Sequence, residues 1–314
     1  MLLAAGTTLA SRVEASWIEE AAPPQGRFVA MPGGRLHLTE REPVGAFRGT
    51  VVLLHGASGN QADMMLALGD RLASAGFRVL APDRPGQGWS DRPDGRADAS
   101  PRRQAALIRQ GLSALGVTHA IVVGHSLGGA VATSFALDER DFTDALVLVA
   151  PVTHPWPTGI AWYYHVAAAP VLGQFFAATL ALPVGSAMLP AGLRAVFAPN
   201  PVPPDYAQRI ALSLMFRPDA FVANAQDVAD LSAFLEGQAP RMSSITVPTA
   251  IVTGDHDGVV WTELHSFASH RAIAGSTLTV LPGVGHSPHW SQPDAVISAI
   301  QSVAARVAAG SLTR

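Results

Sequence analysis

The chain contains no cysteine and no lysine, and both absences restrict its chemistry. None of its 314 residues is cysteine, so disulfide bonds, thiol nucleophiles and cysteine-ligated metals are excluded. All 21 basic residues are arginine, which excludes a Schiff-base lysine and the lysine of a phosphate-binding P-loop. The lack of cysteine also leaves the redox compartment open.

Charge is scarce as well. Charged residues make up 14% of the chain and the formal net charge is −3, without a basic cluster, so we expect no nucleic-acid partner. Hydrophobic residues make up 48%, which is enough for a large core. This composition excludes disorder as the main state and is typical of one sizeable domain, with or without an insertion.

A short apolar run occupies residues 2–10. It is too short to span a bilayer and has no basic region before it. We expect residues 1–26 to form an N-terminal extension that starts with a frayed or docked helix; a trimmed membrane anchor or an export signal is the alternative. The compartment stays open, with the cytoplasm favoured.

The stretch from Ala120 to Gly129 carries the strongest functional signal. An apolar, β-branched run leads into Gly124-His125-Ser126-Leu127-Gly128, and a helix-compatible segment follows to Leu137. A serine at the tip of a sharp strand-to-helix turn exposes its hydroxyl, and the crowded backbone there requires small neighbours. The helix that follows points its positive end at the reacting centre. We therefore predict that Ser126 is a nucleophile; a glycine-rich turn with an incidental serine is the alternative.

Strands and helices alternate on both sides of this stretch. We expect two short strands over residues 27–39, buried strands over 50–54 and 145–149, further strands over 78–81, 245–253 and 277–281, and helices over 62–75, 101–115 and 294–308. Repeated units of this kind indicate a mostly parallel sheet. The core is expected to consist of residues 27–150 and 244–314, separated by an insertion over residues 151–243.

The insertion has an unusual composition. No Asp, Glu, Lys or Arg occurs between Asp144 and Arg194, while aromatic residues and prolines are frequent. Prolines interrupt the apolar run, so we expect a helical lid over an apolar pocket rather than a transmembrane hairpin. Docking against a membrane surface is a less favoured alternative. Candidate lining residues, each of which could instead be core, are Trp162, Tyr163, Phe175, Phe176, Met188, Phe197, Met215 and Phe216.

A nucleophilic serine needs a base, and the base needs a third group that orients it. Among 11 histidines we favour His286, because it follows the last expected strand, at the same edge of the sheet as Ser126. His289 is the alternative base, and could instead shape the pocket or cap the next helix. His125 adjoins the serine but should point elsewhere, packing under the sheet, whereas His55 could brace the loop that follows the strand over 50–54.

The acid should lie between the serine and the base in the chain. Asp257 follows the strand ending at Thr253 and is favoured, with Asp255 as the alternative. The same carboxylates with His256 could be read as metal ligands, but no further cluster at metal spacing supports that reading. We expect neither a metal nor a cofactor.

An oxyanion would be bound by two backbone amides. One is that of Leu127, which follows the nucleophile. The other belongs to the loop after His55-Gly56, where Ala57 is favoured.

In this order the motifs resemble the α/β-hydrolase fold superfamily, from Arg27 onward. They are Leu54-His55-Gly56, the loop from Asp83 to Pro93, Gly124 to Gly129, Gly254-x-x-Asp257 and Gly285-His286. The resemblance implies an α/β fold: a mostly parallel eight-stranded sheet with helices on both faces and a helical lid. The loop from Asp83 to Pro93 is similar to that of a lid-bearing branch that includes epoxide hydrolases, haloalkane dehalogenases and C–C bond hydrolases.

One departure separates the chain from part of that branch. Epoxide hydrolases and dehalogenases use an aspartate where this chain has Ser126, so the resemblance points to ester hydrolysis. The apolar lid favours a medium-sized hydrophobic substrate. C–C bond hydrolysis and perhydrolase activity are the enzymatic alternatives; the former should require a polar lid group such as Arg194 or Arg217 to hold a carboxylate. A hydrolase-like binding protein is the non-enzymatic alternative. The oligomeric state is left open.

Overall fold

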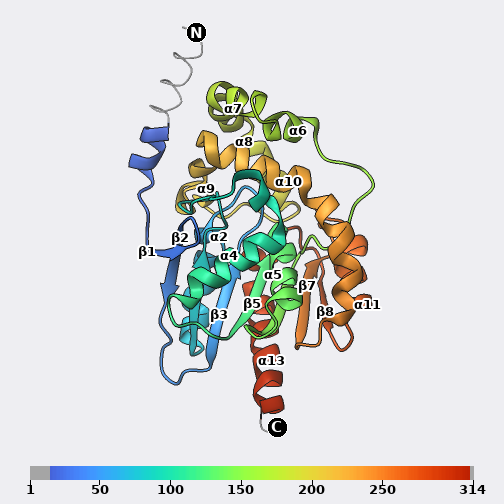
Figure 1. Ribbon diagram of the computed structural model, residues 1–314. Coiled ribbons are helices and arrows are strands. Elements are labelled where there is room, and N and C mark those ends of the chain that lie inside the picture. The colour runs from blue at the N-terminus through green and yellow to red at the C-terminus, as the bar shows by residue number, and fades with distance from the viewer. Residues whose placement is uncertain (1–14, 312–314) are drawn as a thin grey trace.

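The protein is built on an eight-stranded sheet, as a computed structural model shows (Figure 1). The structure describes residues 15–311, so the prediction for the apolar run over residues 2–10 lies outside the described residues. The strands are β1 (Arg27–Met31), β2 (Gly34–Arg41), β3 (Gly49–Leu54), β4 (Phe77–Pro82), β5 (Ala120–His125), β6 (Thr143–Val149), β7 (Thr249–Gly254) and β8 (Thr277–Leu281). They lie in the order β1-β2-β4-β3-β5-β6-β7-β8. The pairs β1–β2 and β2–β4 are antiparallel and all others are parallel. The predicted α/β fold class is confirmed.

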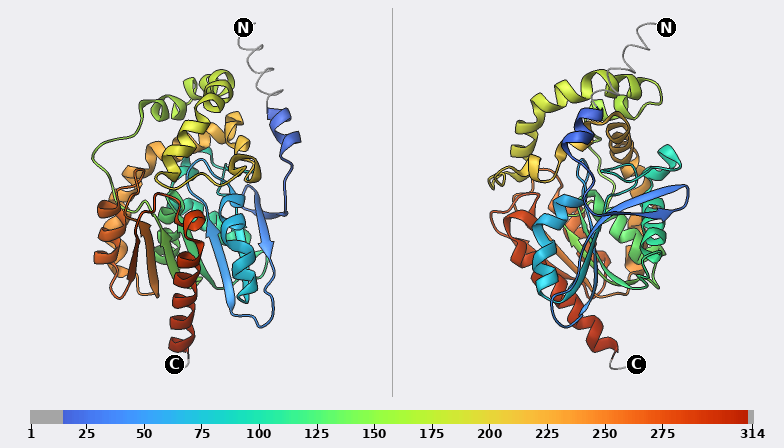
Figure 2. Two further views of the ribbon diagram at one scale, coloured as in Figure 1. Left: turned by 180° about the vertical axis from the view of Figure 1, so that it is seen from behind. Right: turned by 90° about the vertical axis from the view of Figure 1, so that its left-hand side faces the viewer.

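Helices cover both faces of the sheet (Figures 1 and 2). On one face lie α4 (Pro101–Ser113) and α5 (Leu127–Asp138), and on the other α3 (Asp70–Ser74) and α13 (Pro293–Ser311). Within β3, Val51 and Leu53 pack on the α13 side, while Val52 and Leu54 pack on the α5 side. Because side chains of a strand alternate between faces, a strand buried on both sides has the continuous apolar run seen here.

Shorter helical segments complete the core. They are a helix over residues 15–21, α2 (Gln61–Met64), η1 (Met65–Gly69), η2 (Gly95–Ala99), η5 (Ala239–Ser244), η6 (Glu263–Phe267), α11 (Ala268–Ala272) and α12 (Pro288–Ser291). The residue before α4 is Ser100, but its side chain makes no capping hydrogen bond, and Pro101 opens the helix. The fixed φ of proline suits this first position.

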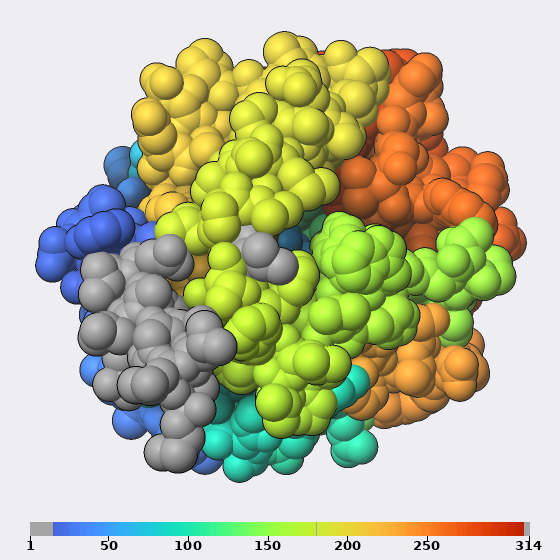
Figure 3. Space-filling model, turned by 90° about the horizontal axis from the view of Figure 1, so that it is seen from above, coloured from blue at the N-terminus to red at the C-terminus, as the bar shows by residue number. Residues whose placement is uncertain are grey.

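A helical insertion separates β6 from β7. Its elements are α6 (Trp162–Ala168), α7 (Leu172–Phe176), η3 (Ala177–Ala181), α8 (Leu182–Phe197), α9 (Tyr206–Arg209), η4 (Leu212–Phe216) and α10 (Pro218–Gln238). We call these elements the cap. They lie across one end of the molecule, and α6 to α8 form much of the surface seen from above (Figure 3). No single helix among residues 15–311 is long and apolar enough to cross a membrane, although Leu172–Thr179 and Leu182–Phe197 would pass together as a pair bent by 76°.

The strand register brings several loops to the edge of the sheet beneath the cap. Leu54 pairs with Gly124, His125 with Val149, and Gly254 with Leu281, so parallel strands end together. Ligand sites of open α/β sheets lie at this carboxyl edge. The predicted functional residues follow these strand ends.

Candidate active site

Ser126 occupies a strained turn between β5 and α5. Its φ of 52° and ψ of −122° are unusual for a residue with a side chain, and the residue is 8% exposed. The turn brings backbone segments together: a Cβ on Gly124 would lie 2.2 Å from the Gly128 carbonyl oxygen, and one on Gly128 would lie 2.4 Å from that of Leu54. Only glycine allows these approaches, which explains the spacing around the serine.

His286 lies in the loop after β8, beside Ser126. Its Nε2 is 2.9 Å from Ser126 Oγ, and its Nδ1 is 2.7 Å from Asp257 Oδ2. The imidazole side chain is only 5% exposed. A base within hydrogen-bond distance of a hydroxyl, itself oriented by a carboxylate, is the arrangement that activates a serine.

Asp257 lies in the loop after β7, with its side chain fully buried. Its Oδ1 accepts hydrogen bonds from the amides of Val259 and Val260, both at 2.9 Å, which leaves Oδ2 for His286. The alternative acid, Asp255, points elsewhere: it pairs with His256 at 2.6 Å and accepts the Gly283 amide at 2.7 Å. The structure therefore places Asp257, and not Asp255, against His286.

The amides of Ala57 and Leu127 lie at the same pocket as Ser126. Within residues 15–311 neither amide has a hydrogen-bond partner. Leu127 is the first residue of α5, where amides lack intrahelical partners and the helix dipole favours negative charge. Two free donors beside the serine are what an oxyanion requires.

The pocket beside Ser126 has a volume of about 300 Å³ and mostly apolar walls. Besides Ser126 and the two oxyanion candidates, it is lined by Val152, Trp156, Thr158, Gly159, Ile160, Ala161, Tyr164, Val228, Leu231, Val259, Val260, Trp261 and His265. None of these is an acid or an arginine. The walls come from α6 and the loop before it, from α10, and from η6 and the loop after β7, rather than from α7 and α8.

The structure corrects the predicted lining residues. Four of them are exposed on the cap: Trp162, Tyr163, Phe175 and Met188. Phe176 stacks on Phe221. The other three pack in hydrophobic clusters within the cap and against the N-terminal helix: Phe197, Met215 and Phe216. None of the eight lines the pocket at Ser126. Composition identified an apolar insertion, but the rotation of each helix depends on distant packing partners. Trp156 and Trp261 could have been found, since both closely follow predicted strand ends.

His265 is a pocket residue that the sequence reasoning missed. Its Nδ1 accepts the amides of Thr153 and His154, both at 3.2 Å. Burial, together with the neighbouring His154, lowers the pKa of His265 to about 4. The ring is therefore neutral near pH 7, and its proton is on Nε2 because Nδ1 accepts.

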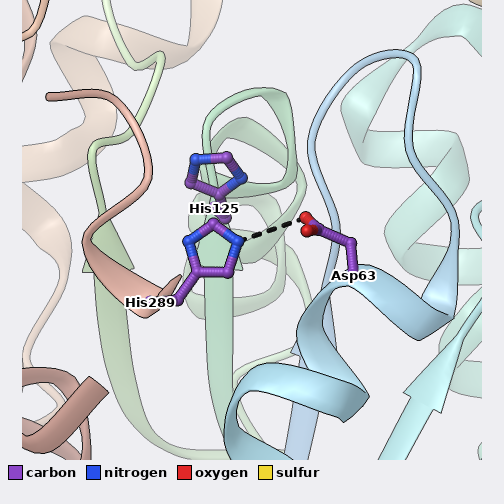
Figure 4. A group of neighbouring side chains, drawn as sticks. All are labelled: Asp63, His125 and His289. Atoms are coloured by element: carbon purple, nitrogen blue, oxygen red, sulfur yellow. Dashed lines mark hydrogen bonds and ion pairs between the residues drawn. The ribbon is translucent and has the colours of Figure 1, made fainter. Parts of the chain in front are cut away.

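A second buried polar group consists of Asp63, His125 and His289 (Figure 4). Asp63 accepts hydrogen bonds from His289 Nε2 at 3.2 Å, Trp290 Nε1 at 2.7 Å and the Tyr206 hydroxyl at 2.8 Å. Burial raises the pKa of Asp63, but the interactions with His289, His125 and Trp290 together outweigh burial and lower the pKa. Asp63 is therefore a buried carboxylate stabilised by three donors.

His125 joins this group to the candidate base. It lies at the carboxyl edge rather than beneath the sheet as predicted, because its ring packs against His286 and His289 and its Nε2 donates to the His286 carbonyl at 2.9 Å. Burial and the two neighbouring imidazoles hold the pKa of His125 well below its ordinary value. His289 thus binds Asp63 and not Ser126, so His286 rather than His289 is placed to act as the base.

Asp63, His125 and His289 also form the one group within residues 15–311 that could hold a metal ion, with ligand atoms within 4.8 Å of one another. A cation there would replace the hydrogen bond that His289 donates to Asp63. The three donors satisfy the Asp63 carboxylate, whereas the Nδ1 atoms of His125 and His289 are buried without a hydrogen-bond partner among the described residues. The acids and His256 that we considered as metal ligands do not form such a group.

Comparisons with known proteins agree with this geometry. The chain matches the model of the alpha/beta hydrolase family over residues 51–299. It is 28% identical over 292 residues to an uncharacterised protein of Mycobacterium tuberculosis, covering 90% of this chain and 82% of that protein. It is also 28% identical over 261 residues to the 2-hydroxy-6-oxo-6-phenylhexa-2,4-dienoate hydrolase of Burkholderia cepacia, covering 78% and 84%.

A solved structure supports the same assignment. The alpha/beta hydrolase fold protein from Nakamurella multipartita superposes with a TM-score of 0.63 and 26% sequence identity, covering 89% of this chain and 99% of that one. Fold, strand order and matched residues all agree, and the chain belongs to the alpha/beta hydrolase family.

Proposed function

We propose that the protein is a serine esterase that cleaves carboxylic esters of medium-sized hydrophobic substrates through an acyl-enzyme. Ser126 Oγ bonds to the ester carbonyl carbon while His286 takes its proton, and Asp257 holds the imidazole in the required tautomer. The amides of Ala57 and Leu127 bind the oxyanion. His286 then protonates the departing alcohol, and water releases the acid by the same steps.

The single observation that carries this proposal is the continuous chain of contacts from acid to nucleophile. Asp257 Oδ2, His286 Nδ1, His286 Nε2 and Ser126 Oγ are joined by distances of 2.7 and 2.9 Å. The distances lie in the range expected for a base poised to take a proton.

The pocket supports a neutral, hydrophobic substrate. Its walls contain no acid and no arginine, so a charged group bound there would lose hydration without gaining a partner. The volume of about 300 Å³ is at the small end for ligand sites. We therefore infer a short to medium acyl group.

C–C bond hydrolysis is the second candidate, favoured by the similarity to the Burkholderia cepacia hydrolase. A dienoate substrate carries a carboxylate, for which Arg194 and Arg217 were the sequence candidates. Arg194 is exposed on the cap, and Arg217 binds Glu19 and the Gly88 carbonyl; neither lines the pocket. The absence of an arginine among the lining residues favours the ester.

Turnover of p-nitrophenyl esters from acetate to octanoate tests the proposal, with a 2-hydroxy-6-oxo-dienoate as the competing substrate. We expect ester turnover, covalent labelling by a fluorophosphonate probe, and loss of both in Ser126→Ala. Turnover that survives in folded Ser126→Ala removes the serine from the mechanism. Preferred cleavage of the dienoate establishes the second candidate. If the wild type shows neither turnover nor labelling, the protein is a hydrolase-like binding protein.

A further inference from the structure

The proposed oxyanion donor Ala57 shares a peptide unit with the Gly56 carbonyl. In a trans peptide the C=O and N–H groups point in opposite directions, so whatever holds the Gly56 oxygen also aims the Ala57 amide. The Gly56 oxygen accepts two hydrogen bonds, from Arg84 Nη2 at 3.1 Å and from His55 Nδ1 at 2.9 Å. These two donors fix the direction of the Ala57 N–H.

Arg84 is itself held on every side. The side chain is fully buried; Nε donates to the His55 carbonyl at 3.1 Å, and Nη1 donates to Gln104 at 2.9 Å and to Asp227 at 2.7 Å. A planar guanidinium with this many fixed partners has one orientation. Its charge next to the Gly56 oxygen also polarises the peptide and makes the Ala57 N–H a stronger donor.

The same arrangement fixes His55. The Arg84 amide donates to His55 Nε2 at 3.0 Å, so the proton of the ring is on Nδ1, where it can be donated to Gly56. Burial and the nearby charge of Arg84 lower the pKa of His55 to about 4. The neutral tautomer required by this network is therefore the one present near pH 7.

The cap holds the other side of Ala57. Asn224, on α10, accepts the Ser58 amide at 2.6 Å and donates to the Ser58 hydroxyl at 3.1 Å. Ser58 has a φ of 57°, a conformation that needs support in a residue with a side chain. Asp227 lies one turn further along α10, on the same face as Asn224.

We propose that Arg84 is a positioning residue for the oxyanion site, and that Asn224 and Asp227 couple the cap helix α10 to it. Arg84 touches neither the nucleophile nor the pocket and acts through the Gly56–Ala57 peptide. Asp227 secures Arg84, and Asn224 secures Ser58. This inference rests on the proposed function, because it assigns Ala57 as an oxyanion donor.

The test compares Arg84→Met and Arg84→Lys with Arg96→Met. Arg96 is the matched control, since it pairs with Asp230 on the same helix α10 but does not contact the loop of Ala57. Asp227 keeps Arg92 as a partner in the Arg84 variants, which limits the charge left unpaired. All variants are first compared with the wild type by urea unfolding.

Two readouts distinguish positioning from a merely structural role. The first is the split between kcat and KM for a p-nitrophenyl ester. The second is inhibition by a trifluoromethyl ketone, whose carbonyl carbon bonds to Ser126 Oγ while the serine proton moves to His286, leaving an oxyanion in the site. Binding of the product alcohol reports the pocket without an oxyanion.

We expect kcat of Arg84→Met to fall on the order of 10²-fold, with trifluoromethyl ketone inhibition weakened by a similar factor. Arg84→Lys keeps the charge without the planar fork, so its loss should be smaller. KM and alcohol binding should change little, and Arg96→Met should behave as the wild type. Unchanged kcat and unchanged ketone inhibition in the folded Arg84 variants overturn the proposal.

A second variant covers the case in which the Arg84 variants do not fold. Asn224→Ala removes only the contact to Ser58, and we expect a loss of about tenfold in kcat and in ketone affinity together. A folded Asn224→Ala without either loss then overturns the proposal. Failure of the proposed function can be distinguished from failure of this inference, because in the former case the ketone does not inhibit the wild type.

Discussion

His286 Nε2 lies 2.9 Å from Ser126 Oγ, although the two residues are 160 positions apart in the chain. They meet because β5 and β8 end at the same edge of the parallel sheet, so the turn after one strand faces the loop after the other. Asp257 follows β7, the strand next to β8, and its carboxylate contacts the other ring nitrogen of His286. The parallel order of the strands thus brings the site together.

The two candidate acids can be separated by mutation. Asp257→Asn removes the carboxylate that orients His286, and we expect kcat for a p-nitrophenyl ester to fall on the order of 10⁴-fold, as for loss of the acid in a Ser-His-Asp site. Asp255→Asn is the matched control, because it alters a neighbouring carboxylate that does not reach His286. Equal losses in both variants would contradict the assignment of Asp257.

Glycines at the nucleophile turn should be less tolerant than glycines elsewhere. Gly128→Ala would place a Cβ 2.4 Å from the Leu54 oxygen and 2.6 Å from the His55 oxygen, so we expect unfolding in urea to require about 1–3 kcal/mol less, together with reduced turnover. Gly237→Ala, near the end of α10 with open space around it, should gain up to about 1 kcal/mol. A neutral Gly128→Ala would show that α5 can move away from β3.

Stability should fall in mild acid because of buried histidines. Burial lowers the pKa of both His55 and His265 to about 4, with Arg84 and His154 as the respective second causes. Between pH 6.5 and 4 the unfolded chain binds protons at these positions and the folded protein does not, so the free energy of unfolding decreases as the pH falls. At pH 5 the expected loss is about 2 kcal/mol for each histidine.

His265→Asn tests this pH dependence. The asparagine carbonyl can accept the same amides that His265 Nδ1 accepts, but it does not titrate. Urea unfolding at pH 7.5 and pH 5 should show a smaller difference in this variant than in the wild type. The exposed His119→Asn is the control. An unchanged difference in His265→Asn would show that this histidine does not contribute.

The acyl-chain preference should respond to α10 and not to the exposed face of the cap. Val228→Phe adds bulk to a pocket of about 300 Å³, so kcat/KM for octanoate should fall on the order of tenfold more than for acetate. Met188→Ala and Phe175→Ala change residues that are 60% and 59% exposed, and both should keep the wild-type preference. A shift in preference from these cap variants would mean that the cap face takes part in substrate binding.

Local sequence patterns were sufficient to predict much of the candidate site. The glycines around Ser126 are required by a turn only a few residues long, and Asp257 and His286 follow strands that are recognisable as apolar runs. The order of the catalytic residues in the chain then limited the acid to the segment between the serine and the base. These features depend on neighbours in the chain, so they could be predicted from the residues alone.

The lining of the pocket and the support of Ala57 could not be predicted in this way. Which face of a cap helix turns inward depends on distant partners, such as Phe221 for Phe176. Asn224 and Asp227 look like ordinary polar residues of a helix, yet they hold Ser58 and Arg84, which lie 166 and 143 residues away.

By itself the sequence determined the parallel α/β sheet, the turn of Ser126 and the order of the three candidate catalytic residues, because short-range periodicity and glycine spacing encode them. Only the tertiary structure decided that Asp257 rather than Asp255 reaches His286, that His289 serves Asp63, and that α10 and not α8 forms the pocket wall. Those outcomes depend on side-chain directions set by packing across the whole fold, which no local pattern records.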